Sequence, residues 1–154
     1  MNSLKLKDLD LKDLSKIGHN IGQELKGGEV FELVSDLGGG KTTLTKAIVK
    51  GTKSDDQVSS PSFTICNEYS SKNFKIYHFD FYRLLDPGII SLELKEILED
   101  SQNSIVIIEW PESVLEVLPK NHIKIVISIS GDGLRDTVIY YPNNLAYLLR
   151  GVSK

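Results

Sequence analysis

The amino-acid sequence predicts an α/β domain over residues 1–154, with three layers, a mixed and mainly parallel central sheet, and an antiparallel hairpin near the C-terminus. Three observations predict this class. A strand-like run leads through a glycine loop into a helical segment at 29–51. An unalternated apolar run lies within 104–110, and two alternating runs at 122–141 are separated by turn residues.

Composition limits the classes of function. The chain has 154 residues, of which 40% are hydrophobic and 25% charged, so a folded domain is expected rather than a disordered chain. The formal net charge is −3 and the pI is about 5.6. These values argue against a protein whose main task is to bind nucleic acid by itself, but they are compatible with a subunit of an RNA-handling complex.

Cysteine content and the N-terminus bear on the compartment. Cys66 is the single cysteine, so we expect neither an intrachain disulfide nor a cysteine metal cluster, and a buried, unreactive thiol is the simplest interpretation. The N-terminus lacks the apolar core of a signal peptide. No apolar run approaches the roughly 18 residues of a membrane span. We therefore expect a cytoplasmic protein that makes no contact with a membrane.

The first half of the chain predicts a helix, a strand and a second helix. Apolar residues at helical spacing predict a helix over 11–25, which Gly27 and Gly28 end. A strand is expected at 29–34. After the glycine loop, "TTLTKAIVKG" predicts a helix that closes at Gly51.

The second half of the chain predicts two further strands, a short helix, an antiparallel hairpin and a terminal helix. "FKIYHFDFYRL" at 74–84 is rich in aromatic and β-branched residues and predicts a strand running into Asp80, and 91–100 predicts a short helix. "SIVIIEW" at 104–110 suits a parallel strand buried on both faces. "HIKIVISIS" alternates strictly, and with "GDG" and "LRDTVIYY" it predicts an antiparallel hairpin. "NNLAYLLRG" predicts a terminal helix.

The loop between the first strand and the second helix matches a phosphate-binding pattern at its end. Three glycines, Gly38 to Gly40, let the backbone wrap closely around phosphate oxygens, and the following helix N-terminus adds a favourable dipole. Lys41 supplies a charge for the β- and γ-phosphates, and the Thr42 hydroxyl can ligate Mg²⁺. The pattern departs from G-x-x-x-x-G-K-[ST] at its first position, where Ser35 replaces glycine. The predicted fold class is therefore P-loop NTPase-like. The loop itself is a working nucleotide site, a degenerate loop that does not bind nucleotide, or a chance match to the pattern.

Two acids are candidates for the carboxylate that a P-loop site needs. Glu109 follows the apolar run "IVII", and Asp80 follows "FKIYHF", so both are expected at carboxyl ends of strands, where α/β sheets bind ligands. The alternative for each is a solvent-facing acid or a helix cap. For Trp110, a core or interface position is favoured over a contact with a ligand. For His78, a packed, hydrogen-bonded histidine is favoured over a role in proton transfer. For Arg83, a structural ion pair with an acid is favoured over a contact with a phosphate.

Four blocks together resemble one family. They are "SDLGGGKTTLTKAI" (35–48), "SSPSFTICNEY" (59–69), "YHFDFYRL" (77–84) and "IIEWPE" (107–112). The combination of S-P-[ST]-F-T, H-F-D-x-Y-R-L and I-E-W-P-E at these spacings is specific, and it is similar to the TsaE (YjeE) family of small bacterial P-loop ATPases that serve tRNA threonylcarbamoyladenosine synthesis. The resemblance covers most of the chain.

The resemblance implies a cytoplasmic, Mg²⁺-dependent ATPase that works with TsaD and TsaB and meets tRNA only indirectly, through that complex. In the family, TsaD transfers the threonylcarbamoyl group from an adenylate made by TsaC, and the resemblance implies that ATP hydrolysis by the small subunit allows this transferase to turn over. It implies Lys41, Asp80 and Glu109 as catalytic residues and Thr42 with Glu109 as the metal site. It implies nucleotide contacts from a larger set: Leu37, Gly38, Gly39, Gly40, Lys41, Thr42, Thr43, Asp80 and Arg135.

The resemblance also implies a switch segment, and the sequence departs from the family pattern at three positions. Ser60 to Thr64 is expected to sense the γ-phosphate, beside Asp80. Ser35 stands where the family has glycine, Ser62 where threonine is common, and Leu14 where a threonine near the adenine side is frequent. The last departure affects the expected contacts to the base and leaves the phosphate chemistry intact.

Other functions compete with the ATPase hypothesis. A small-molecule kinase clamps phosphates with several arginines, whereas this chain has only three, Arg83, Arg135 and Arg150. A GTPase is disfavoured because the chain has no N-K-x-D motif. A binding module whose loop senses nucleotide without hydrolysing it would use the same residues, so the sequence leaves that alternative open.

Overall fold

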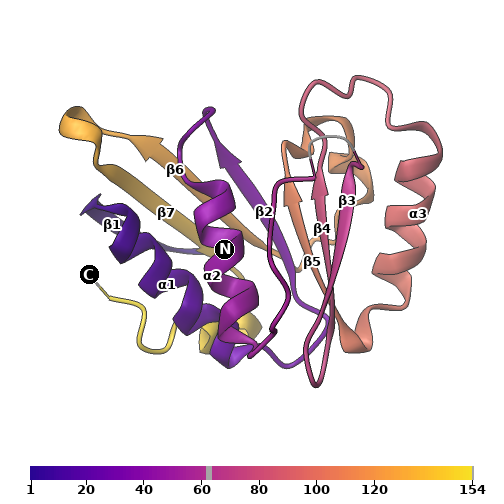
Figure 1. Ribbon diagram of the computed structural model, residues 1–154, viewed down its shortest axis with the longest axis horizontal. Coiled ribbons are helices and arrows are strands. Elements are labelled where there is room, and N and C mark those ends of the chain that lie inside the picture. Colours follow the sequence, from indigo (N-terminus) through magenta and orange to yellow (C-terminus); the bar gives the residue numbers. More distant parts are fainter. Residues whose placement is uncertain (62–63, 154) are drawn as a thin grey trace.

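A seven-stranded sheet forms the centre of the computed structural model, which describes residues 1–61 and 64–153 (Figure 1). Across the sheet the strand order is β1-β7-β6-β2-β5-β4-β3. The strands are β1 (Asn2–Leu9), β2 (Val30–Ser35), β3 (Cys66–Ser70), β4 (Lys75–Asp80), β5 (Ser104–Glu109), β6 (Ile123–Ile129) and β7 (Arg135–Tyr141).

The strand directions confirm a mixed, mainly parallel sheet. Strands β6, β2, β5 and β4 run parallel to their neighbours in the centre. Strand β7 is antiparallel to β6, and the two form the predicted hairpin around the 3₁₀ turn Gly131–Gly133. Strand β1 is antiparallel to β7, and β3 is antiparallel to β4, so antiparallel pairs lie at both edges.

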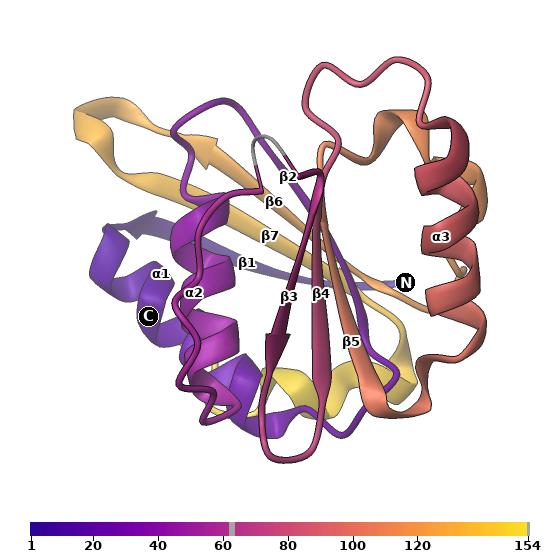
Figure 2. The same cartoon turned by 45° about the vertical axis from the view of Figure 1, so that its right-hand side comes forward.

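Helices cover the sheet on two faces and make the three predicted layers (Figures 1 and 2). Helices α1 (Leu11–Glu24) and α2 (Lys41–Gly51) pack together on one face, and α3 (Gly88–Glu99) lies on the other. The α1–α2 contact is close, because a Cβ on Gly22 would lie 2.1 Å from the Ile48 carbonyl oxygen. Glycine at this crossing therefore lets the two helices approach.

Strand β5 confirms the prediction of a strand buried on both faces. All six of its residues are buried. Ile105 and Ile107 join the apolar cluster under α1 and α2, whereas Val106 and Ile108 join the cluster under α3. An unalternated apolar run is what a central parallel strand between two helical layers requires.

Strand β4 runs into Asp80 as predicted, and it ends there because the Asp80 carboxylate accepts the Tyr82 backbone N–H and Arg83 takes a positive φ of 59°, which turns the chain. Other expected boundaries differ from the structure. Helix α3 begins at Gly88 rather than at 91. The predicted terminal helix is a 3₁₀ segment, Asn143–Leu149. Ile129, the last isoleucine of the alternating run, lies at the end of the hairpin and is 49% exposed.

Two edge strands were not predicted. The segment that forms β1 contains lysines and aspartates between its leucines, and the segment of β3 is "CNEYS". Edge strands tolerate such polar composition because a single neighbour supplies their hydrogen bonds, here β7 and β4. The remaining short 3₁₀ segments are Ser101–Asn103, Pro111–Ser113 and Leu115–Val117. Within the described residues no helix is long and apolar enough to cross a bilayer.

Candidate nucleotide site

The glycine loop joins the end of β2 to the start of α2, and each glycine has its own reason. Gly38 and Gly40 take φ values of 75° and 117°, in the left-handed region that side chains disfavour. A Cβ on Gly39 would lie 2.5 Å from the Ser35 hydroxyl oxygen, and one on Gly40 would lie 2.6 Å from a methyl carbon of Leu14. The loop therefore needs all three glycines to keep its path.

Lys41, the first residue of α2, is held against the loop itself. Its side chain is buried, and Nζ donates to the Ser35 carbonyl at 3.0 Å, the Ser35 hydroxyl at 2.9 Å and the Asp36 carbonyl at 3.3 Å. The ammonium also lies 4.2 Å from the centre of the Trp110 ring. Burial lowers the pKa of Lys41, and the carboxylates of Glu109 and Asp80 oppose that shift.

Ser35 explains how the loop accommodates its departure from glycine. The side chain is buried, and its hydroxyl donates to the Asp36 carbonyl at 2.9 Å while accepting from Lys41. Serine thus fits at the end of β2 without displacing the loop, and it adds an acceptor for the lysine. Binding of a phosphate to Lys41 has to exchange that acceptor for a phosphate oxygen.

The two candidate acids lie side by side, because the β4–β5 register pairs Asp80 with Glu109. Glu109 is buried, and its Oε1 lies 2.9 Å from Nε2 of His78, which is fully buried on β4. A carboxylate only accepts, so Nε2 of His78 carries the donated proton. His78 is therefore the packed, hydrogen-bonded histidine that was expected, and it orients the carboxylate.

Asp80 connects the site to the segment after α2. Its Oδ1 accepts the Tyr82 N–H at 2.9 Å, and its Oδ2 accepts the Ser60 hydroxyl at 3.1 Å. Thr64 hydrogen-bonds Asn67 at 2.9 Å. Residues 62–63 of the predicted switch segment, including Ser62, lie outside the described residues.

One cavity of about 490 Å³ gathers the site residues predicted from the sequence. All ten line it: Leu37, Gly38, Gly39, Gly40, Lys41, Thr42, Thr43, Asp80, Glu109 and Arg135. Arg135, at the start of β7, reaches the loop and donates from Nε to the Gly39 carbonyl at 3.3 Å. The geometry assembles these residues, while their individual roles stay predictions.

Four further residues line the cavity: Leu11, Ser60, Tyr82 and Trp110. The Trp110 ring lies 4.9 Å from that of Tyr82, centre to centre, so this tryptophan belongs to the site rather than only to the core. Tyr82 belongs to the block H-F-D-x-Y-R-L, which indicated the family but gave this residue no role. Leu11 carried no signal in the sequence, since an apolar residue at a helix start is ordinary. Leu14 is fully buried below Gly40, and it does not line the cavity.

The oxygen donors at the cavity fit a magnesium ion. Thr42 offers a hydroxyl and Glu109 a carboxylate, and Mg²⁺ prefers oxygen ligands and keeps several waters beside substrate phosphates. Among residues 1–61 and 64–153 no three His, Cys, Asp or Glu side chains are grouped to hold a metal. A site that completes its shell with phosphate and water needs no such group.

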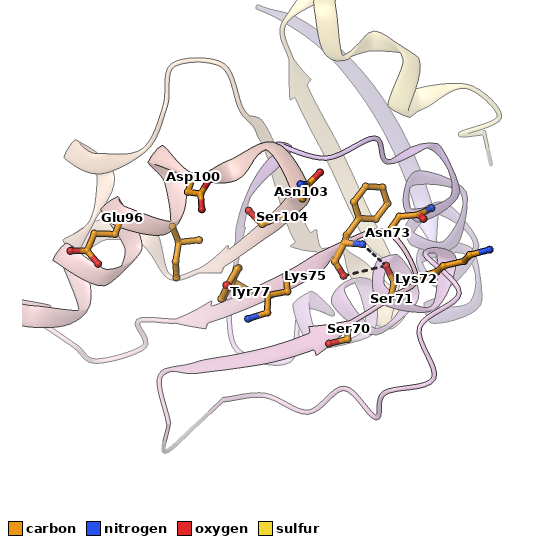
Figure 3. A pocket seen from close by; sticks show the side chains of 12 residues that line it. Ser70, Ser71, Lys72, Asn73, Lys75, Tyr77, Glu96, Asp100, Asn103 and Ser104 are labelled. Atoms are coloured by element: carbon orange, nitrogen blue, oxygen red, sulfur yellow. Dashed lines mark hydrogen bonds between the residues drawn. The ribbon is translucent and has the colours of Figure 1, made fainter.

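A second cavity, of about 550 Å³, lies away from the glycine loop (Figure 3). It is formed by the β3–β4 turn, the end of α3 and the start of β5. Its lining mixes Lys72 and Lys75 with Glu96 and Asp100. The glycine loop does not line this cavity, and its lining has no excess of positive charge. The cavity of about 490 Å³ beside the glycine loop is therefore the better candidate for phosphate binding.

Comparisons with known proteins identify similar chains. A family model described as "Threonylcarbamoyl adenosine biosynthesis protein TsaE" matches residues 9–137. A relative from Nostoc sp., named tRNA threonylcarbamoyladenosine biosynthesis protein TsaE, is 34% identical over 132 residues, covering 84% of this chain and 81% of the relative. A Bacillus subtilis relative of the same name is 34% identical over 136 residues, covering 88% of this chain and 84% of the relative. The crystal structure of Bacillus subtilis YdiB superposes with a TM-score of 0.79 at 29% identity, covering 98% of this chain and 94% of that one.

Proposed function

This chain belongs to the TsaE family of threonylcarbamoyl adenosine biosynthesis proteins, and from that premise we propose that it is a cytoplasmic ATPase subunit of tRNA threonylcarbamoyladenosine synthesis. It binds Mg·ATP in the cavity at the end of β2 and hydrolyses it to support turnover of the TsaB–TsaD transferase. Its contact with tRNA is indirect, through that complex.

The observation that carries the proposal is the convergence of the glycine loop and the two acids on one cavity. Lys41 lies at the base of the loop, and the register of β4 and β5 puts Asp80 beside Glu109 at the same edge of the sheet. This is the edge at which parallel α/β sheets bind their ligands. A loop of chance composition would not require the acids to meet it.

Each residue then has a distinct task. The amides of Gly38–Gly40 and the N-terminus of α2 bind the phosphates, and Lys41 turns from Ser35 to the β/γ-phosphate oxygens. Thr42 and Glu109 hold Mg²⁺, which neutralises charge on the phosphates, while His78 keeps the Glu109 carboxylate oriented. Asp80 orients the attacking water and relays the hydrolytic state to Ser60. Arg135 steadies the loop through the Gly39 carbonyl.

The second candidate is an adaptor that senses nucleotide without hydrolysing it. The hydrogen bonds from Lys41 to the loop oxygens favour it, because a lysine already satisfied gains less from a phosphate. A small-molecule kinase is less favoured, since Arg135 lines the cavity but neither Arg83 nor Arg150 does. Arg83 instead lies 4.9 Å from the Tyr82 ring centre.

The decisive experiment measures ATP hydrolysis by the wild type and by Lys41→Ala, each with and without TsaB–TsaD. Hydrolysis by the wild type that requires Lys41 and rises with the partners supports the ATPase. Nucleotide binding without hydrolysis, even with the partners, supports the adaptor. Unchanged hydrolysis by a folded Lys41→Ala protein contradicts the P-loop hypothesis, with circular dichroism as the check on folding.

A further inference from the structure

The groove between helices α1 and α2 carries an unbalanced positive charge. The two helices lie side by side on one face of the sheet (Figures 1 and 2). A cavity of about 500 Å³ lies between them, and we call it the basic groove. Seven residues line it: Ser15, Lys16, His19, Thr43, Lys46, Ala47 and Lys50. Three lysines and no carboxylate therefore line this space, in a chain whose formal net charge is −3.

The carboxylates of the two helices lie away from the basic groove. Helix α2 contains no Asp or Glu. The acids of α1 are Asp13 and Glu24, and they share one flank of the helix with Asn20, at spacings of i, i+11 and i+7. Asn20 donates to the Gly151 carbonyl at 2.9 Å, so this flank faces the C-terminal segment rather than α2.

The lysines of the basic groove are not neutralised by neighbours in the chain. Among residues 1–61 and 64–153, none of Lys16, Lys46 and Lys50 forms a salt bridge. Of the two acids that follow α2, Asp56 accepts the Ser70 backbone N–H at 2.6 Å and therefore lies at β3. A helix face that only meets solvent commonly mixes the two signs of charge. A groove with one sign alone indicates an anionic ligand.

The lining of the basic groove decides which class of anion fits. Lysines and the hydroxyls of Ser15 and Thr43 are donors of the kind that contact the phosphates of a nucleic acid. Protein interfaces are depleted in lysine and enriched in Tyr, Trp, Phe, Met and Arg, none of which lines the groove. A lipid surface is bound through large apolar side chains that insert, whereas the apolar residue here is Ala47. A phosphate backbone is therefore favoured over an acidic protein or a bilayer.

The basic groove adjoins the nucleotide cavity without being part of it. Thr43 lines both spaces, and Lys46 and Lys50 follow it on α2 at spacings of three and seven residues, so the lysines lead away from the nucleotide. The base of a nucleotide carries no charge, so three lysines beyond Thr43 point to phosphates other than those of ATP. A backbone in the basic groove would lie beside a bound nucleotide.

We propose that the basic groove binds the sugar–phosphate backbone of RNA, with Lys16, Lys46 and Lys50 contacting its phosphates. The inference rests on the proposed function in taking tRNA as the RNA to be tested. Three phosphate contacts give weak, salt-dependent binding, and the net charge of the chain opposes it. The TsaB–TsaD complex therefore still delivers the tRNA, and the basic groove adds a direct contact to that indirect one.

The first test compares Lys46→Gln/Lys50→Gln with the matched control Lys72→Gln/Lys120→Gln. All four lysines are exposed, and both variants lose the same charge. The control lysines lie in the β3–β4 turn and before β6, outside the basic groove. Glutamine has a helix propensity close to that of lysine, so both variants should fold, as checked by circular dichroism.

Binding of an unmodified tRNA transcript to each free protein is then measured over a series of salt concentrations. The groove variant should bind at least about tenfold more weakly at low salt, and the control within about twofold of the wild type. The slope of log affinity against log salt should fall by about 1.4–1.8 in the groove variant, since each phosphate contact contributes about 0.7–0.9. Mg·ATP affinity should be equal in all three proteins, because none of the substituted lysines lines the nucleotide cavity.

The second test uses the wild type in its complex. Acetylation of each lysine by an N-hydroxysuccinimide ester is followed by mass spectrometry, with TsaB–TsaD and Mg·ATP present throughout. Adding tRNA should slow acetylation of Lys16, Lys46 and Lys50 and leave Lys72 and Lys120 unchanged. Polyglutamate, a carboxylate polyanion, should protect the groove lysines less than tRNA does at the same concentration of charge.

The outcomes separate this inference from the proposed function. Weaker tRNA binding by the groove variant alone, together with protection of the groove lysines, supports the RNA contact. Equal tRNA binding by the groove variant and the control, or no protection by tRNA, overturns the contact and leaves the ATPase proposal standing. Equal protection by polyglutamate assigns the basic groove to an acidic protein and overturns the inference. Failure of the wild type to hydrolyse ATP with its partners contradicts the proposed function, whichever way the lysines respond.

Discussion

Replacing Ser35 by glycine tests how the natural loop holds its lysine. In the structure the three N–H donors of Lys41 have three acceptors, two of which belong to Ser35. Ser35→Gly removes the hydroxyl acceptor at 2.9 Å and keeps the carbonyl acceptor at 3.0 Å. The free protein thereby loses one hydrogen bond to a buried charged group, and the nucleotide-bound protein, in which the lysine donates to phosphate, loses less.

The expected change in affinity follows from that difference. A hydrogen bond to a charged group contributes about 1.5 kcal/mol at the low end of its range, which would tighten Mg·ATP binding by roughly tenfold. Glycine at the end of β2 adds backbone freedom that costs about 0.5–1 kcal/mol when the loop is ordered around phosphate. The net expectation for Ser35→Gly is binding about two- to fivefold tighter. Ser35→Ala removes the hydroxyl without adding that freedom, so its gain should approach about tenfold.

Titration of each protein with Mg·ATP measures these changes. Calorimetry gives the affinity, and fluorescence of the single tryptophan, Trp110, reports the site directly because Lys41 lies over its ring. Lys41→Ala in the same series shows how much binding depends on the ammonium. A gain beyond about a hundredfold in Ser35→Gly would mean that the natural loop is degenerate, in favour of the adaptor. A loss of affinity in both Ser35 variants would refute the reasoning, because Ser35 would then be holding Lys41 in its binding position.

Three further predictions follow from the acids, a buried ion pair and the cysteine. Glu109→Gln should remove part of the Mg²⁺ dependence of ATP binding, whereas Asp80→Asn should leave binding nearly intact and slow single-turnover hydrolysis at least about a hundredfold; the reverse pattern would mean that the two roles are exchanged. His122 Nε2 lies 2.9 Å from a carboxylate oxygen of Glu32. Burial raises the pKa of Glu32, but hydrogen bonds from His122 and Lys124 lower it more, so the pKa lies below its ordinary value. The pKa of His122 lies above its ordinary value, chiefly through the hydrogen bond to Glu32. Stability from Glu32 is present above pH 4.5 and is lost as the pH falls through its folded pKa, whereas that from His122 is present below pH 6.5 and is lost as the pH rises through its folded pKa. The difference in unfolding free energy between the wild type and His122→Ala should therefore be largest between these values and shrink toward pH 8, and equal differences by urea titration at pH 5.5 and 8.5 would contradict the pair. Burial raises the pKa of Cys66 to about 12 from 9.0, so alkylation by iodoacetamide at pH 8 should be roughly a thousandfold slower than for an ordinary thiol, since the thiolate is the nucleophile; labelling at the ordinary rate would show that the thiol is open to solvent.

Local patterns were sufficient for much of the fold. The helical stripe that includes Leu14 and Ile17 and the unalternated run of β5 both predicted burial correctly, because each depends on a repeat within one element. Strand β1 was missed although Leu4 and Leu6 alternate with lysines, because the run is short, its register shifts between Leu6 and Leu9, and its pairing with β7 joins segments from the two ends of the chain. The end of β4 at Asp80 was predicted correctly, and in the folded chain the Tyr82 backbone N–H donates to the Asp80 carboxylate at that end.

The glycine loop could be predicted from its residues alone, since Gly40, Lys41 and Thr42 are neighbours and a strand-to-helix connection needs no distant contact to form. By contrast, the hydrogen bond of His78 to Glu109, 31 residues away, and the reach of Arg135 to Gly39, 96 residues away, follow from the folded arrangement of the strands. The contact of Trp110 with Lys41 has the same origin. Such contacts depend on strand order and register, which arise from packing of the whole sheet between its helices, and the local pattern of one segment does not contain them.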